Sequence, residues 1–242
     1  MSATRNAIIL AAGEGKRLLP FTLTAPKSFA RVGGVSILEN ALHALAAHGC
    51  EEVCIVIGHH AELVRQTLSG RFAGMAIRYV LNPVYRTTNS MYSLALGLEG
   101  VEQPTWVLEG DIFLSPTVLD LESSHEIGWF VDSTTRELDG AFVEADERGV
   151  AHDLSIVRDL RLLRPRQSKS VGILRLSAAG AYRLRGWLKE GIAAGRQNVY
   201  YDLIIADHLR EGCVGIVDVA GRKWFEIDSH ADLEAAGRLF GA

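Results

Sequence analysis

Residues 10–27 read LAAGEGKRLLPFTLTAPK, and this stretch decides the fold of the chain. It follows an apolar run at residues 7–10 and leads into a helical pattern that begins at Ser36. The order therefore predicts a strand, a glycine-bearing loop and a helix. Glycines let backbone N–H groups approach a polyphosphate closely, and cations neutralise its charge. The loop supplies both kinds of residue: Gly13, Gly15, Lys16, Arg17 and Lys27.

The spacing of these glycines excludes the two commonest phosphate loops. The pattern GxxxxGK followed by Ser or Thr is absent, and Leu18 stands where a dinucleotide-binding loop has its third glycine. Two glycines alone often form only a tight turn. The full pattern LAAGxGxRLxPxTxxxPK, followed by ILE at residues 37–39, is far more specific. It resembles the sugar-phosphate nucleotidyltransferase superfamily, whose members transfer a nucleoside monophosphate from a nucleoside triphosphate to a phosphorylated acceptor.

Composition bounds the size of the fold and the kind of partner. The 242 residues suit one α/β domain, and the 48 % that are hydrophobic supply a core. The 25 cations and 29 anions leave a net charge of −4, so there is no basic field for a nucleic-acid partner. We expect one nucleotidyltransferase domain at 1–242, with an NTP-binding half at 1–120 and an acceptor-binding half at 121–242.

The cysteines and the start of the chain predict the compartment. Cys50, Cys54 and Cys213 form no C-x-x-C pair and no zinc spacing, so we interpret them as thiols in a reducing compartment. Residues 1–5 lack a long apolar segment, and no apolar run approaches 18 residues. These features favour a cytoplasmic protein with no membrane partner.

Apolar runs and helical patterns alternate along the first half of the chain. Strands are predicted at 7–10, 52–57, 77–81 and 105–108, and helices at 36–48, 61–68 and from Thr88 or Asn89 to Leu98. This βαβ order predicts right-handed crossovers and a doubly wound, mainly parallel, Rossmann-like sheet flanked by helices. Ligands of such sheets bind at the carboxyl ends of the strands, where the glycine loop stands.

The second half is less regular. Strands are predicted at 128–132, 171–176, 214–219 and 223–227, and helices at 178–190, from Val199 to Leu209 and from Ala231 onward. Residues 133–170 between them are rich in charge and are predicted to form a small strand-rich excursion.

Two acids follow strand ends in this scheme. Asp111 follows the strand at 105–108, and Asp228 follows the last strand. Carboxylates at such positions can hold Mg²⁺ against phosphates, although most acids at strand ends are simply solvated.

Three later motifs narrow the resemblance. They are NPxY with TNSxxSL at residues 82–94, YYD at 200–202 and WFEID at 224–228. Together with the short length, they resemble the small cytidylyltransferases that act on phosphocholine and on phosphonates such as 2-aminoethylphosphonate. The alternative within the superfamily is a sugar-1-phosphate nucleotidylyltransferase that uses another NTP. A homodimer is compatible with the resemblance.

The resemblance implies roles for the matching residues. Arg17 and Lys27 would be catalytic, with Arg17 at the β- and γ-phosphates and Lys27 at the α-phosphate and the acceptor phosphate. Asp111 and Asp228 would bind Mg²⁺. The implied nucleotide-binding residues are Leu10, Ala11, Ala12, Gly13, Gly15, Lys16, Asn82, Asn89, Ser90 and Asp111. The alternative for Asn89 is that it only caps its helix, where Asn is strongly favoured.

The acceptor is less determined than the nucleotide. A cationic acceptor such as phosphocholine or an aminoalkylphosphonate needs a carboxylate or aromatic groups. The candidates are Tyr85, Tyr92, Trp129, Asp132, Tyr200, Tyr201 and Asp202, of which we assign Tyr85, Tyr201 and Asp202 to the acceptor site. Lys169 would instead suit an acceptor with a second negative charge, such as phosphonoformate.

The expected chemistry needs no general base. The acceptor is a small phosphorylated or phosphonate molecule whose oxygen is already ionised at neutral pH. That oxygen would attack the α-phosphorus of CTP while pyrophosphate leaves in line. The barrier is the repulsion between two anions and the charge that develops on the leaving group, which Arg17, Lys27 and Mg²⁺ would offset.

Overall fold

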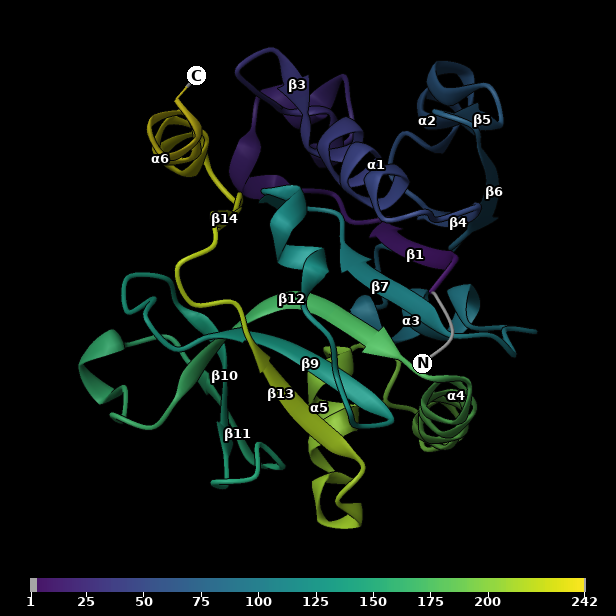
Figure 1. Cartoon of the computed structure of the whole chain (residues 1–242). Coiled ribbons are helices and arrows are strands. Elements are labelled where there is room, and N and C mark those ends of the chain that lie inside the picture. The colour runs from purple at the N-terminus through teal and green to yellow at the C-terminus, as the bar shows by residue number, and fades with distance from the viewer. Residues whose placement is uncertain (1–3, 242) are drawn as a thin grey trace.

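A computed structural model describes residues 4–241 as helices packed on both faces of a ten-stranded sheet (Figure 1). The compartment prediction drew on residues 1–5, and residues 1–3 lie outside the described part of the chain. Four parallel strands form the centre in the order β7 (Thr105–Glu109), β1 (Asn6–Ala11), β4 (Glu52–Ile57) and β6 (Met75–Leu81). The apolar runs of β7, β1 and β4 are buried because both faces of the sheet are covered there, whereas only Met75 and Ile77 of β6 are buried.

Alternate residues of the central strands point to opposite faces, and each face has its own helices. Ile9 and Ile55 pack under α1 (Ile37–Ala47) and α2 (Ala61–Leu68). Ile8 and Val56 pack in the opposite core, which is covered by α3 (Ser90–Gly97), α4 (Ala178–Ala193) and α5 (Tyr201–Ala206). The predicted doubly wound sheet is confirmed.

The predicted start of α1 is also confirmed. The Ser36 hydroxyl accepts from the Glu39 N–H at 3.1 Å, and the Glu39 carboxylate accepts from the Ser36 N–H at 2.9 Å. This reciprocal capping box satisfies two N–H groups that the first helical turn cannot pair internally.

The second half extends the sheet with antiparallel strands. β12 (Ser168–Leu176) pairs antiparallel with β7 and with β9 (Ile127–Asp132), and β13 (Val214–Asp218) lies parallel to β9. The predicted excursion is a hairpin of β10 (Gly140–Ala145) and β11 (Ala151–Val157) at the sheet edge.

Several boundaries differ from the prediction, and two of them change how an element is described. β12 begins at Ser168 rather than Val171, because Lys169 and Ser168 pair with β10. α5 ends at Ala206, and a separate 3₁₀ turn covers Leu209–Glu211. Between the two, the His208 ring stacks on Trp187 at 4.4 Å.

A small two-stranded sheet carries the chain end back to the glycine loop. β14 (Trp224–Glu226) pairs antiparallel with β8 (Ile112–Leu114), which directly follows β7. α6 (His230–Phe240) then packs over the short strand β2 (Arg31–Val32). β2 forms a hairpin with β3 (Val35–Ser36). Elsewhere, the short strand β5 (Arg71–Phe72) pairs with β6. Among residues 4–241, no helix combines the length and apolarity that crossing a bilayer requires.

Candidate active site

The glycine loop bends sharply at Gly15. This residue has φ +62, and a Cβ built on it would lie 2.8 Å from the Lys27 Cβ. The Gly15 carbonyl accepts from the Leu18 N–H at 2.9 Å and from the Thr22 hydroxyl at 3.1 Å. Glycine is thus required both by the left-handed backbone and by the close approach of Lys27. A cavity of about 490 Å³ lies beside the loop.

We expect Gly15→Ala to raise the KM for the nucleotide about tenfold or more, because the added methyl must push Lys27 or the loop aside. Steady-state kinetics measures this. Gly34→Ala is the matched control, since Gly34 has φ +85 but open space around it. An equal effect of both variants would mean that backbone strain, not the loop geometry, is responsible.

Asp111 and Asp228 meet because β14 pairs with the segment after β7. The Ile227 N–H donates to the Asp111 carbonyl at 2.9 Å, which places the two aspartates side by side. The Lys27 Nζ lies 2.7 Å from Asp111 Oδ2 and 2.5 Å from Asp228 Oδ1. Arg17 binds the other Asp228 oxygen at 2.6 Å. The two acids, Lys27 and Arg17 therefore converge at one point, whereas Lys16 is exposed and pairs with Glu14 instead.

The Lys27 ammonium is firmly held in its charged form. Burial alone would lower the pKa of Lys27, but the charges of Asp111 and Asp228 outweigh it and raise the pKa above its ordinary value. Burial likewise opposes the charge of Asp228, but Lys27 and Arg17 lower the pKa of this carboxyl. The Lys27 ammonium and the Asp228 carboxylate are thus both charged at neutral pH.

The aspartate pair has the donor chemistry of a magnesium site. Asp111 Oδ1 is buried and has no hydrogen-bond partner among residues 4–241, so it has a free lone pair to give. In the same part of the chain, no group of three or more His, Cys, Asp or Glu side chains forms a metal cluster. Mg²⁺ commonly takes one or two protein carboxylates and completes its shell with phosphate and water oxygens. The residues present fit such an ion.

A second cavity of about 260 Å³ adjoins the first and shares the wall formed by Leu10, Gly13, Asp111 and Asp228. Most of the residues that the sequence predicted for nucleotide or acceptor line one cavity or both. Those in the 260 Å³ cavity are Leu10, Ala12, Gly13, Arg17, Asn82, Tyr85, Asn89, Ser90, Asp111, Lys169, Asp202 and Asp228. Those in the 490 Å³ cavity include Ala11, Gly15, Lys16 and Lys27.

Three of these residues also hold the walls together. The buried Asn82 side chain donates to the Thr88 and Ser93 hydroxyls, each at 3.1 Å. Asn89 caps α3, which was the alternative reading, and also lines both cavities. The Ser90 hydroxyl accepts from the Tyr201 N–H at 3.2 Å and so ties α3 to α5.

Tyr201, which the sequence predicted to contact the acceptor, does not line the cavities. Its side chain is fully buried in the core under α5 and lines neither cavity, whereas Tyr200 lines both. Successive residues at the start of α5 point in different directions, so Tyr201 is a core residue while its neighbours Tyr200 and Asp202 line the cavity. Tyr200, rather than Tyr201, is the tyrosine in position to contact a ligand.

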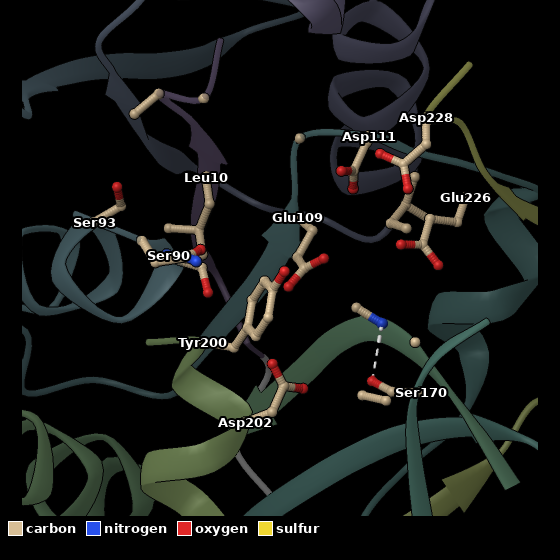
Figure 2. Close-up of a pocket in the computed structure, with 18 of the residues that line it drawn as sticks. Leu10, Ser90, Ser93, Glu109, Asp111, Ser170, Tyr200, Asp202, Glu226 and Asp228 are labelled. Atoms are coloured by element: carbon tan, nitrogen blue, oxygen red, sulfur yellow. Dashed lines mark hydrogen bonds between the residues drawn. The ribbon is translucent and has the colours of Figure 1, made fainter. Parts of the chain in front are cut away.

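The far end of the smaller cavity is acidic. Glu109, Asp202 and Glu226 all line it, and Figure 2 shows Glu109 between the Asp111–Asp228 pair and the Tyr200–Asp202 side. Lys169 is buried on this wall, and its ammonium binds Glu226 at 2.7 Å and the Ser170 carbonyl at 3.0 Å.

Negative charge is crowded in this acidic cluster. Burial raises the pKa of Asp202 to about 6. Burial, followed by the charges of Asp111 and Asp202, raises the pKa of Glu109 well above its ordinary value. Burial also raises the pKa of Glu226, although Lys169 opposes the shift. A cation placed among these groups would therefore be stabilised.

Sequence reasoning missed Glu109 and Glu226 as site residues, although a signal was present. Each stands two positions before a predicted metal ligand, in Glu109-Gly110-Asp111 and Glu226-Ile227-Asp228. Residues two apart on an extended segment face the same side, so both E-x-D pairs turn toward one site.

Comparisons with known proteins agree with this geometry. Residues 7–121 match the MobA-like NTP transferase domain. The chain is 34 % identical to CMP-5'-(3-aminopropyl)phosphonate synthase from Streptomyces rubellomurinus, over 97 % of this chain but only 38 % of that longer protein. It is 26 % identical to 2-aminoethylphosphonate cytidylyltransferase from Lancefieldella rimae, over 95 % of this chain and 91 % of that protein.

The fold has solved counterparts. CTP:phosphocholine cytidylyltransferase from Streptococcus pneumoniae superposes with a TM-score of 0.81 at 22 % identity, over 98 % of this chain and 99 % of that one. Residues 7–121 therefore match a MobA-like NTP transferase domain, and the chain as a whole has the fold of this cytidylyltransferase.

Proposed function

We propose that the chain is a Mg²⁺-dependent cytidylyltransferase that moves CMP from CTP to an aminoalkylphosphonate and releases pyrophosphate. The observation that carries the proposal is an acid-lined cavity that opens directly beside Lys27, Asp111 and Asp228. A phosphonate near Lys27 would then have room for a cationic tail pointing at Glu109 and Asp202. The names of the two similar phosphonate enzymes support this acceptor class.

The reaction follows from the charges of the site. A phosphonate oxygen forms a bond to the α-phosphorus, and the bond from that phosphorus to the pyrophosphate oxygen breaks. Both reactants are already ionised, so no proton has to be removed. Lys27 would sit between the two anions and reduce their repulsion, and Arg17 would hold the departing pyrophosphate. Mg²⁺ held by Asp111 and Asp228 would neutralise further phosphate charge.

The charge distribution favours a cationic over an anionic acceptor. Lys169 suggested a second negative charge, but its ammonium is already paired with Glu226 at 2.7 Å. Glu109 and Asp202 form no ion pair with any cation among residues 4–241. An anionic tail such as the carboxylate of phosphonoformate would face these two acids, whereas an ammonium would pair with them.

The lining also favours a primary amine over a quaternary one. A trimethylammonium group has no N–H donors and is bound best by aromatic faces. Trp129 does not line the cavity, because it is buried and donates its N–H to Ser170 at 2.9 Å. The aromatic residues that line the cavity are Tyr85 and Tyr200. A primary ammonium can donate to both carboxylates at once.

Turnover with four NTPs and five acceptors tests the proposal. We expect pyrophosphate release with CTP and 3-aminopropylphosphonate or 2-aminoethylphosphonate, weaker turnover with phosphocholine, and the weakest with phosphonoformate. EDTA should abolish the activity. Turnover with a sugar 1-phosphate and UTP, GTP or dTTP, and none with the amines, would instead establish the sugar nucleotidylyltransferase alternative.

A further inference from the structure

Three histidines contact the outer side of the glycine loop. The Nε2 atoms of His59 and His60 lie 2.8 Å and 3.2 Å from the Thr22 carbonyl, and the Nε2 of His230 lies 3.0 Å from the Leu19 carbonyl. A carbonyl can only accept, so each imidazole donates through Nε2–H. Two different elements, the turn after β4 and the start of α6, thus fasten one loop.

The turn after β4 is itself locked to the loop. The His59 N–H donates to the Ala12 carbonyl at 3.0 Å. A Cβ on Gly58 would lie 2.6 Å from that same carbonyl, so the turn packs against the loop without space. His60 takes a left-handed conformation with φ 53, which turns its ring back beside that of His59 at 4.0 Å between centroids.

Thr22 connects the histidine contacts to the part of the glycine loop that faces the 490 Å³ cavity. Its carbonyl receives the two imidazoles, and its hydroxyl donates to the Gly15 carbonyl at 3.1 Å. Among the described residues, the N–H groups of Gly13, Glu14 and Gly15 donate to no protein acceptor. The loop carbonyls are thus engaged on one side, and the amide donors are free on the side of the 490 Å³ cavity.

We propose that His59, His60 and His230 are positioning residues that hold the glycine loop in the shape that receives a triphosphate. None of the three lines either of the two cavities that form the site, so they act through the loop and not on the substrate. The inference depends on the proposed function only in taking the loop ligand to be a triphosphate. We call these three side chains the histidine clamp. Without the clamp, ordering the loop would reduce the net binding energy of the triphosphate.

The test uses inorganic tripolyphosphate with Mg²⁺ as a probe that reports the loop alone. For the variant His59→Leu with His60→Leu, we expect about a tenfold weaker Kd for tripolyphosphate and a similar rise in the KM for CTP. That is the size expected from losing one or two neutral hydrogen bonds. The KM for the acceptor should change less than about twofold. Amide hydrogen exchange in residues 13–24 should become faster.

Rescue and controls separate positioning from a general loss of stability. His59→Gln with His60→Gln keeps an N–H donor at similar reach and should restore binding to near the parent value. His152→Leu, an exposed histidine on β11 away from the loop, should change nothing. His230→Leu removes one exposed contact and should give a smaller effect in the same direction, which keeps the test valid if the double Leu variant does not fold.

Unchanged binding in a folded Leu variant, failure of Gln to restore it, or an equal rise in the acceptor KM would overturn the clamp. Tripolyphosphate binding by the parent enzyme without CTP-dependent turnover would overturn the proposed function and leave the clamp to be judged by Kd alone. No tripolyphosphate binding by the parent enzyme would overturn both.

Discussion

Lys27→Met lowers kcat for CMP transfer by about 10²–10³, the size expected when one group that stabilises developing charge is removed. The Lys27 ammonium contacts both aspartates, and in the proposed reaction it would lie between the two phosphorus centres. Methionine keeps the length and the buried contacts of the side chain but not the charge. Pyrophosphate release at saturating CTP and acceptor measures the loss.

Lys16→Met is the matched control for this variant. Lys16 lies in the same loop, but its side chain is 76 % exposed and pairs with Glu14 at 2.9 Å rather than with the aspartates. We expect its kcat to change less than about threefold. If both variants lost activity equally, the net charge of the loop rather than the position of Lys27 would be responsible.

The double variant Glu109→Gln with Asp202→Asn raises the KM for 3-aminopropylphosphonate by about 10²-fold or more and leaves the KM for CTP nearly unchanged. Each carboxylate would accept a charge-assisted hydrogen bond from the ammonium, and such bonds contribute about 1.5–3 kcal/mol. Steady-state kinetics with both substrates varied separates the two constants. Asp207→Asn is the control, because Asp207 follows the same helix but pairs with the exposed Arg196.

The pH dependence of acceptor binding provides an independent check. Because burial raises the pKa of Asp202 to about 6, its charged form is lost as the pH falls through that value. The parent enzyme should therefore bind the amine more weakly below about pH 6, and Asp202→Asn should flatten this part of the profile. A parent KM for the amine that does not depend on pH between 5 and 8 would contradict the assigned role of the acid cluster.

The sequence predicted the parts of the fold that depend on local patterns. The segments 52–57 and 61–68 correspond to β4 and α2 residue for residue, because the first is a continuous apolar run and the second has clear helical spacing. The meeting of Asp111 with Asp228 was predicted only through the family resemblance. Its physical cause is the pairing of β14 with β8, a long-range contact that has no signature in either segment alone.

Other features could not be predicted from local patterns. The charge of Lys169 suggested an anionic acceptor, but only the folded chain shows that Glu226 already neutralises it. Tyr200 and Tyr201 are adjacent identical residues, so the choice of wall residue depends on how α5 packs. The role of His59 and His60 as a clamp arises because Thr22, far away in the chain, comes to lie against their turn.

The hairpin of β10 and β11 has a consequence for how such an enzyme can diversify. One contiguous excursion at the sheet edge supplies the outer wall of the smaller cavity, through Asp139, Gly140, Ala141, Ile156 and Arg158. Insertions or exchanges there would reshape the space for the acceptor tail without disturbing the parallel strands that carry the glycine loop. Selection can therefore retune which small molecule is activated while the nucleotide chemistry is inherited intact.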